Sequence, residues 1–280
     1  MILDMNKITF VPIGGLANRM RTIASALMLS QQTNSRLNIV WFKDWALYAP
    51  FGMLFEPIVK EGLSLREAEG YDALLFDRPR KKNLYLPAVY QSMAFADCIY
   101  ERSFYSLTQQ NFDFVKWVNE KKNVYMASYT AFQPYENTLM SELFVPVPMV
   151  RDKIEKRCSS FSENVIGVHI RRTDNIASIE KSPLELFYRE LDLELDKNER
   201  NLIYLATDSE EVKSMMKKRY GKKILSSTAP ADRSSIDGIQ DGIADMYTLA
   251  RTNKIYGSFQ SSFSEIASQI GGNQLVVLKV

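Results

Sequence analysis

Apolar and polar residues alternate in blocks along the chain, and the first blocks predict a βαβ unit. Lys7 to Ile13 has the pattern of a short strand that ends at Gly14-Gly15. From Leu16 to Ser30 apolar residues recur at helical spacing, and Arg36 to Trp41 predicts the next strand. A strand, a glycine turn, a helix and a second strand indicate a parallel sheet with a right-handed crossover.

The second half of the chain repeats this alternation. The expected elements are a strand Val165–Ile170, a helix Pro183–Leu195, a strand Asn201–Ala206, a helix Ser209–Tyr220, a strand Lys223–Leu225, a helix Asp241–Arg251, a strand Lys254–Gly257, a helix from Ser262 and a strand Gln274–Leu278. Strands that alternate with helices in this way predict a second parallel sheet with helices on both faces.

The middle of the chain is less regular and contains the expected domain boundary. Between Lys43 and Lys122 the pattern loosens, and Asn123 to Tyr129 predicts a later strand. The irregular part, Asp44 to Ala96, is typical either of a region shaped for a variable partner or of irregular packing without a role. Two prolines within Phe144 to Met149 favour an extended crossover. We therefore expect two α/β domains, residues 1–147 and 148–280, that face each other across a cleft, a preferred place for small-molecule sites.

Composition narrows the classes of partner. Hydrophobic residues make up 46% and charged residues 24% of the 280 residues, which is ordinary for a globular protein. Because 35 basic residues face 33 acidic ones, the net charge of +2 gives no general attraction to nucleic acid or to an anionic membrane. Positive charge must therefore act locally if it acts at all.

Cysteine, histidine and hydropathy bear on metals and compartment. Cys98 and Cys158 match no zinc or redox spacing, and the single histidine argues against a His-based metal site, whereas a carboxylate-bound magnesium stays possible. Met1 to Lys7 lacks the regions of a signal peptide, and no apolar run approaches the length of a membrane span. We expect a reduced, cytoplasmic protein without a transmembrane segment.

The strand Val165–Ile170 ends in a cluster of polar residues that suits a diphosphate. It delivers the only histidine, His169, followed by Arg171 and Arg172. Arginine is suited to phosphate because its charge is permanent and its planar fork donates two parallel hydrogen bonds. Adjacent residues of an extended segment point opposite ways, so we expect Arg171 to face the ligand and Arg172 to brace the loop. A surface ion pair with Asp174 or with a neighbouring glutamate is the alternative for both arginines. His169 is expected either to contact the ligand or to order the loop, and a satisfied core histidine is the alternative.

Two further polar stretches follow strands of the same expected sheet. Asp208 lies where the second strand of this half gives way to a helix, and it could accept hydrogen bonds from ribose or sugar hydroxyls, although Ser209 beside it is a natural N-cap. The serine-rich turn before the last helix offers Ser261, Ser262 and Ser264, since helix amino termini bind phosphate well. Ordinary capping is the alternative there, because Ser262 to Glu265 has the spacing of a capping box.

Together these stretches resemble the GDP-fucose-dependent fucosyltransferases, a group that includes the α1,6-enzymes, the rhizobial nodulation chitooligosaccharide enzymes and α1,2-type enzymes. His169 to Asp174 resembles their His-x-Arg-Arg-x-Asp motif, Tyr204 to Asp208 their second motif, and Ser262-Phe263-Ser264 their third. Gly14 to Arg19, which includes Gly15 and Asn18, resembles their glycine-rich loop. The resemblance covers most of the second half and the start of the first.

The resemblance implies a GT-B fold, in which the second domain binds the nucleotide sugar and the first binds a glycan acceptor. It implies that Arg171 grips the diphosphate and that Ser264 adds a donor to it. It implies that His169 and Asp245 help to hold the guanosine, with Asp208 near the nucleotide. Asp245 has no salt partner at i+4 and would be free to face the cleft or solvent. The resemblance also implies an inverting transfer of L-fucose with neither metal nor further cofactor.

The general base is the open part of this interpretation. Glu180 resembles the position of a family glutamate, but its spacing from the arginine motif departs from the family pattern, and a family lysine is Asn175 here. The alternatives to a fucosyltransferase are a glycosyltransferase that uses another nucleotide sugar and a catalytically inert module that binds a nucleotide sugar or a glycan. A dinucleotide oxidoreductase fits poorly, because Gly14-Gly15 is not the G-x-G-x-x-G fingerprint.

Overall fold

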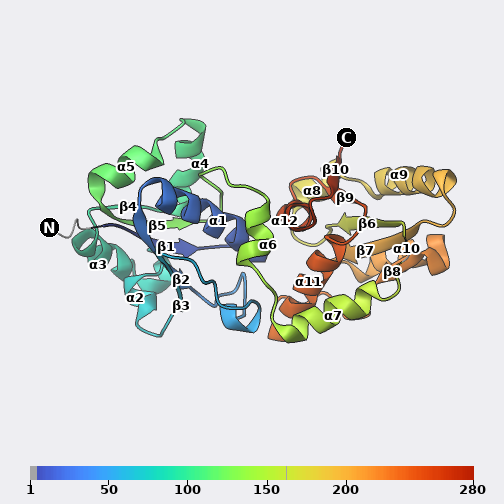
Figure 1. Cartoon of the computed structure of the whole chain (residues 1–280), viewed down its shortest axis with the longest axis horizontal. Helices are drawn as coiled ribbons and strands as arrows, with labels where there is room; N and C mark the ends of the chain where they lie inside the picture. The colour runs from blue at the N-terminus through green and yellow to red at the C-terminus, as the bar shows by residue number, and fades with distance from the viewer. Residues whose placement is uncertain (1–4, 162) are drawn as a thin grey trace. The chain divides into compact units, whose positions relative to one another are not determined.

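The computed structural model describes residues 5–161 and 163–280, and the chain divides into two compact units, Met1–Leu139 and Met140–Val280 (Figure 1). Residues 1–4, part of the stretch inspected for a signal peptide, and residue 162 lie outside the described residues. Each unit has helices and a five-stranded parallel sheet, so the α/β class is confirmed. The assignment of residues 1–147 to the acceptor and 148–280 to the donor stays a prediction.

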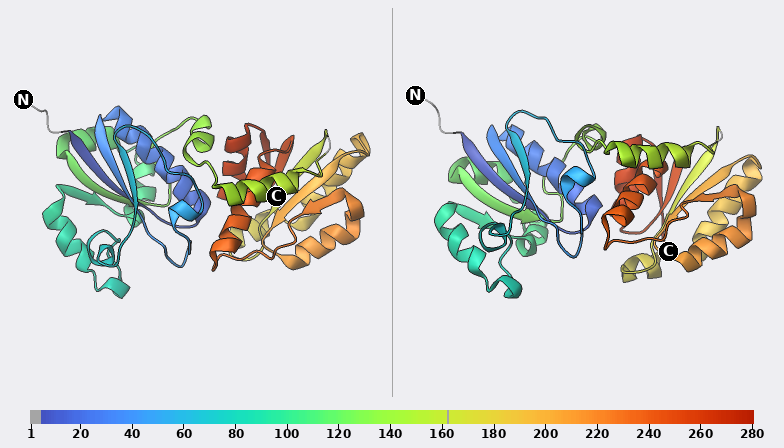
Figure 2. Two further views of the ribbon diagram at one scale, coloured as in Figure 1. Left: turned by 60° about the horizontal axis from the view of Figure 1, so that its bottom comes forward. Right: turned by 90° about the horizontal axis from the view of Figure 1, so that it is seen from below.

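The sheet of the first unit has the strand order β3-β2-β1-β5-β4, and every neighbouring pair is parallel (Figure 2). Its strands are β1 (Asn6–Pro12), β2 (Ser35–Trp41), β3 (Leu63–Glu67), β4 (Asp97–Ile99) and β5 (Asn123–Ser128). The expected βαβ unit is therefore present, with β1 paired to β2 through the crossover helix α1 (Leu16–Gln32).

Helices and aromatic side chains cover both faces of this first sheet. Besides α1, the helices are α2 (Asp72–Leu75), α3 (Leu86–Ala94), α4 (Glu101–Gln109) and α5 (Phe114–Lys121), with short 3-10 turns η1 (Phe51–Met53) and η2 (Lys81–Asn83). The boundary between the two units falls within α6 (Thr138–Leu143). On one face Phe10 packs against Phe132, which also contacts aromatic rings of α4 and α5. On the other face Tyr125 contacts Phe95, beside α3. The core of the unit therefore lies on both sides of its sheet.

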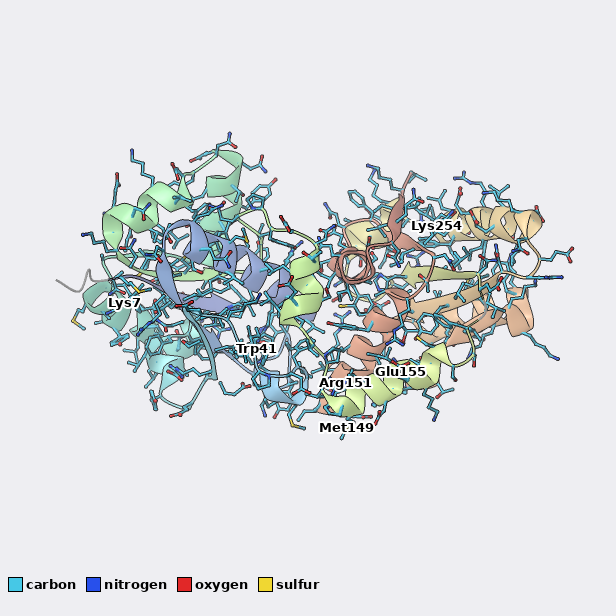
Figure 3. All side chains as sticks on the ribbon, viewed as in Figure 1. Lys7, Trp41, Met149, Arg151, Glu155 and Lys254 are labelled. Atoms are coloured by element: carbon cyan, nitrogen blue, oxygen red, sulfur yellow. The ribbon has the colours of Figure 1, made fainter. Side chains whose placement is uncertain are left out.

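The second unit has the strand order β10-β9-β6-β7-β8, again with every neighbouring pair parallel. Its strands are β6 (Val165–Ile170), β7 (Leu202–Thr207), β8 (Ile224–Ser226), β9 (Lys254–Ser258, beginning at the lysine labelled in Figure 3) and β10 (Gln274–Leu278). Its helices are α7 (Pro148–Cys158), α8 (Ile176–Lys181), α9 (Leu184–Lys197), α10 (Glu210–Tyr220), α11 (Ile236–Leu249) and α12 (Ser262–Gly271), with the 3-10 turn η3 (Gly221–Lys223).

The two faces of the second sheet pack against different helices. Val168 and Leu205 point into an apolar core that α9 and α10 complete through Phe187 and Met216. His169 lies one residue on from Val168 and therefore points to the opposite face, where α11 and α12 pack. The candidate residues thus lie at the strand ends and on the α11 and α12 side of the sheet.

Several element boundaries differ from the expected ones. The helix expected from Asp241 begins at Ile236, because Ser235 occupies the N-cap and its hydroxyl accepts a hydrogen bond from the backbone N–H of Gly238 at 3.1 Å. Within Lys43 to Lys122 lie the short helices α2 to α5, two 3-10 turns and the short strands β3 and β4. Among the described residues, no helix is long and apolar enough to cross a bilayer.

Candidate functional site

The loop Arg171–Asn175, between β6 and α8, is tied to the strands on both sides of β6. The backbone N–H of Arg171 donates to Ser258 Oγ at the end of β9 (3.1 Å), and that of Arg172 donates to Asp208 Oδ1 just beyond β7 (2.7 Å). All three strands are parallel, so their carboxyl ends share one edge. The loop is therefore held at the edge where open α/β sheets bind ligands.

Arg172 braces this loop. Its Nη1 donates to the carbonyl of Arg171 (2.9 Å) and its Nη2 to the carbonyl of Ser182 (2.7 Å), while its guanidinium carbon lies 6.0 Å from the ring centroid of Phe187. Burial lowers the pKa of this half-buried arginine. The bracing geometry is the one expected for Arg172, and its contribution to donor binding stays a prediction.

Arg171 is partly exposed, and its guanidinium shares the carboxylate of Asp174 with Arg233. Its Nε and Nη2 contact Asp174 Oδ1, each at 2.8 Å, while Arg233 Nη1 donates to Asp174 Oδ2 at 2.5 Å. Burial by itself would raise the pKa of Asp174, but the bonds from Arg233 and Arg171 outweigh it and hold that pKa below its ordinary value. The ion pair with Asp174 that was the alternative reading of Arg171 is therefore present.

Asp208 orders the loop from the β7 side. Its carboxylate accepts from the backbone N–H of Arg172 and from Thr173 Oγ1 (2.7 Å), and Arg233 Nη2 lies 3.6 Å from its Oδ2. Ser209 is the N-cap of α10 and accepts from Val212 N, as its alternative reading expected. Both carboxylate oxygens of Asp208 thus hold the loop. Contact of Asp208 with a nucleotide stays a prediction.

His169 is buried, and it links β6 to the start of α12. Its Nδ1 lies 3.1 Å from Ser261 Oγ, and its ring stacks on Phe263 with centroids 4.6 Å apart. Only 7% of the residue is exposed, and burial, reinforced by the charges of Arg171 and Arg233, lowers its pKa to about 4. His169 is therefore neutral at pH 7 and orders the loop before α12.

The capping box expected at Ser262 is wrong. Gln260 adopts a left-handed backbone (φ 52°), so the turn comes one residue earlier and Ser261 becomes the N-cap, with its hydroxyl engaged by His169 rather than by a helix N–H. Ser264 is fully buried, and its hydroxyl donates to the Ser261 carbonyl at 3.1 Å. Ser262 and Phe263 are partly exposed. Phosphate binding by this turn stays a prediction.

Asp245 has one ionic partner and one hydrogen-bond donor from other elements, although it has no salt partner at i+4. Its Oδ1 accepts from Arg157 Nη1 of α7 (3.0 Å) and from the Tyr204 hydroxyl of β7 (2.5 Å). Burial raises the pKa of this carboxyl. The partners are remote in sequence, so a search at i+4 misses them. Tyr204 is registered with Gly167, two positions before His169, so Asp245 shares the face of His169 but lies further down the sheet.

Glu180 lies in α8, after the arginine loop. Its side chain is exposed and makes no hydrogen bond or ion pair with the described residues. α8 is capped by Asn175, whose Oδ1 accepts from Ser178 N (3.0 Å) and whose Nδ2 reaches the carbonyl of Gln260 (3.4 Å). The structure thus joins the loop to the α12 turn through Asn175, but it does not bring Glu180 into contact with the arginines.

The glycine loop belongs to the first unit, and Asn18 and Arg19 hold it in place. Gly14 has φ +84°, a conformation that favours glycine, and Asn18 packs over it so closely that an added Cβ would lie 3.1 Å from Asn18 Nδ2. Gly15 is the N-cap of α1. Arg19 is fully buried and donates to the carbonyls of Gly14 (2.8 Å) and Phe42 and to Asp44 Oδ1 (2.9 Å).

Solved structures with this two-sheet architecture give the comparison. The NodZ α-1,6-fucosyltransferase soaked with GDP-fucose has a TM-score of 0.66 and 18% identity, over 95% of this chain and 92% of that chain; NodZ comes from Bradyrhizobium. Arabidopsis thaliana FUT1 in complex with GDP has a TM-score of 0.65 and 13% identity, over 98% and 70%. This chain has the fucosyltransferase fold. POFUT1 in complex with GDP-fucose shares it, with a TM-score of 0.59 and 12% identity over 98% and 99%. No protein-family model and no curated protein matches the sequence.

For two residues of this fucosyltransferase fold, Arg233 and Arg19, the sequence predicted no individual role. Arg233 stands alone in a polar loop after a short edge strand, and nothing in the local pattern marks it. Arg19 left a usable signal, because it lies four residues before Ile23 on the inward stripe of α1, where a charge needs a partner. The described residues contain no group of three or more His, Cys, Asp or Glu that could hold a metal ion.

Proposed function

We propose that this chain transfers L-fucose from GDP-fucose to a hydroxyl group of a glycan acceptor. The observation that carries the proposal is the outward-facing arginine cluster at the carboxyl edge of the second sheet, where Arg171 and Arg233 share Asp174. It occurs in a fold whose solved examples include complexes with GDP and with GDP-fucose. Open α/β sheets bind nucleotides at this edge, and arginine side chains there suit a diphosphate.

The proposed chemistry is a single displacement at the anomeric carbon that inverts its configuration. Negative charge grows on the departing GDP while the sugar takes on oxocarbenium character. A fixed guanidinium at the diphosphate stabilises that charge as it develops, and Arg171 is the residue that we assign to this role. Because the arginines supply positive charge where it is needed, we propose a transfer that uses no metal ion. Turnover that persists undiminished in excess EDTA is the expected result.

The proton of the acceptor hydroxyl needs a base that the arginine cluster does not supply. His169 is buried and has a pKa of about 4, so we assign it to nucleotide binding together with Phe263 rather than to proton transfer. Glu180 is an exposed carboxylate without a competing partner among the described residues, and we propose it as the base. Glu180→Gln, which keeps the shape of the side chain, should lower kcat far more than it raises the Kd for GDP.

Calorimetric titration with GDP-fucose, GDP-mannose and UDP-sugars, followed by measurement of GDP release, tests the proposal. We expect submillimolar binding of guanine nucleotides and GDP release that depends on an acceptor. Tight binding of UDP-sugars alone would point to a transferase with another donor. Binding of GDP-fucose without GDP release across a broad acceptor panel would replace transfer by an inert binding module.

For the acceptor we propose a platform on the first unit around Trp45. This side chain is 80% exposed, although its turn is rigid: Asp44 Oδ1 accepts from Ala46 N and Leu47 N, and the buried Arg19 holds Asp44. Lys43 Nζ lies 4.2 Å from the ring centroid of Tyr48 beside it. Rigid exposed aromatic rings after the end of β2 suit the apolar face of a sugar ring.

Trp45→Ala should therefore raise the KM for the acceptor about tenfold, the loss of about 1.4 kcal/mol of contact. The Kd for GDP should stay unchanged. Tyr105→Ala, which removes another exposed aromatic ring from the first unit, is the matched control. Equal acceptor KM values in the two variants would place the acceptor elsewhere.

A further inference from the structure

Arg233 lies in the segment between β8 and α11, and its backbone is fixed by its neighbours. The carboxylate of Asp232 accepts from Ser234 N (2.8 Å), from Ser234 Oγ (2.6 Å) and from Ser235 Oγ. The segment also presses against the first turn of α11, because a Cβ at Gly238 would overlap the backbone of Asp232. Arg233 therefore extends from a constrained turn, although its own side chain is 56% exposed.

The guanidinium of Arg233 reaches back to the arginine loop and not to its own segment. One nitrogen binds Asp174 Oδ2 at 2.5 Å, and another lies 3.6 Å from Asp208 Oδ2. Arg171 binds the remaining oxygen, Oδ1, of Asp174. The exposed carboxylate of Asp174 thus lies between the guanidinium group of Arg171, from the arginine loop, and that of Arg233, from the segment between β8 and α11.

The charges of this cluster do not balance. At Asp174 two guanidinium charges, from Arg171 and Arg233, meet one carboxylate, while Arg172 is balanced by the charges of Asp208 and Glu185. Because Asp174 is 44% exposed and Arg233 56% exposed, water screens their ion pair, which contributes little to folding. The fold gains little from the pair, so the geometry calls for another explanation.

We propose that Arg233 is a second diphosphate-binding residue and that Asp174 occupies the place of phosphate oxygens until the nucleotide arrives. A carboxylate and a phosphate present similar oxygen pairs to an arginine fork, so the position that suits one suits the other. The diphosphate brings more negative charge than Asp174 and turns the local excess of positive charge into attraction. This inference rests on the proposed function and adds to it a residue from a separate segment.

The test compares GDP with guanosine by calorimetry in the full chain. Arg233→Ala should weaken GDP binding about 10- to 100-fold, the loss of one charge-assisted contact, and leave guanosine binding unchanged. Arg251→Ala is the matched control, because Arg251 follows the other end of α11, is 47% exposed and forms its ion pair within the described residues with the exposed Glu155 (labelled in Figure 3). It should leave both affinities unchanged, and thermal melting should show that both variants fold.

Asp174→Asn provides a second arm, since it keeps the shape of the side chain but removes the competing charge. GDP should then bind more tightly than to the unchanged protein, with a steeper dependence on salt. Equal GDP affinity in Arg233→Ala and the unchanged protein would overturn the inference while leaving the proposed function standing. A parallel loss of GDP and guanosine affinity in Arg233→Ala would also overturn it, because that pattern marks a structural role. If the unchanged protein binds no GDP, the proposed function itself fails.

Discussion

Replacing Arg171 with alanine is expected to lower kcat/KM for fucosyl transfer by about 10²–10³-fold, by analogy with the removal of one donor to a developing oxyanion. The guanidinium would meet the diphosphate as its charge grows, so the loss should fall on kcat as well as on nucleotide binding. Stability should hardly change, because Arg171 pairs with the exposed Asp174. GDP release under saturating acceptor is the measurement.

Arg189→Ala controls for the loss of one positive charge from the second unit. Arg189 lies on α9, is 64% exposed and pairs with the adjacent Glu190. It should retain full activity. Turnover of Arg171→Ala within twofold of this control would remove Arg171 from the diphosphate and leave the proposed mechanism without its central charge.

Regular hydrophobic periodicity made much of the second unit predictable. The strand limits expected at Val165–Ile170 and Gln274–Leu278 coincide with β6 and β10. Both segments are short runs of residues with high strand propensity, bounded by polar residues. β6 is buried throughout, whereas only Leu278 of β10 is, so propensity rather than burial explains the correct limits of β10. The parallel arrangement followed from the alternation of strands with helices. The structure confirms it in both sheets.

The first unit was less predictable between Lys43 and Lys122, where long-range contacts replace periodicity. β4 has only three residues, and its pairing with β5 decides its conformation. Leu84 and Tyr85 both have positive φ, which local propensity disfavours and the surrounding hydrogen bonds impose. No pattern confined to the local sequence contains this information.

The candidate site shows the same limit at the level of side chains. The division of roles between Arg171 and Arg172 followed from strand alternation, and the bracing contacts of Arg172 match it. The partners of Asp245 and the approach of Arg233 to Asp174 join segments far apart in the chain. The spacing rules apply within one element, so such pairings appear only when the sheet has brought the segments together.

Removing the partner of the buried arginine in the first unit should have the largest effect on stability. Arg19 is fully buried beside Trp41, its guanidinium carbon 4.8 Å from the ring centroid, and it forms an ion pair with Asp44, while Glu67 acts on it at longer range. Burial lowers the pKa of Arg19 to about 10, so the group is still charged at neutral pH. Asp44→Ala should therefore leave an uncompensated buried charge and lower the unfolding free energy by about 3–5 kcal/mol.

Tryptophan fluorescence during urea unfolding measures this cost in the first unit, because all three tryptophans of the chain lie there. Glu120→Ala is the control: it breaks an exposed ion pair with Lys116 on α5 and should cost less than about 1 kcal/mol. Asp44→Asn should fall between the two, since it keeps an acceptor for Arg19 but removes the charge. Equal costs for Asp44→Ala and Glu120→Ala would mean that water reaches Arg19, and the Gly14 turn would then lack the rigid anchor that its bond to Arg19 implies.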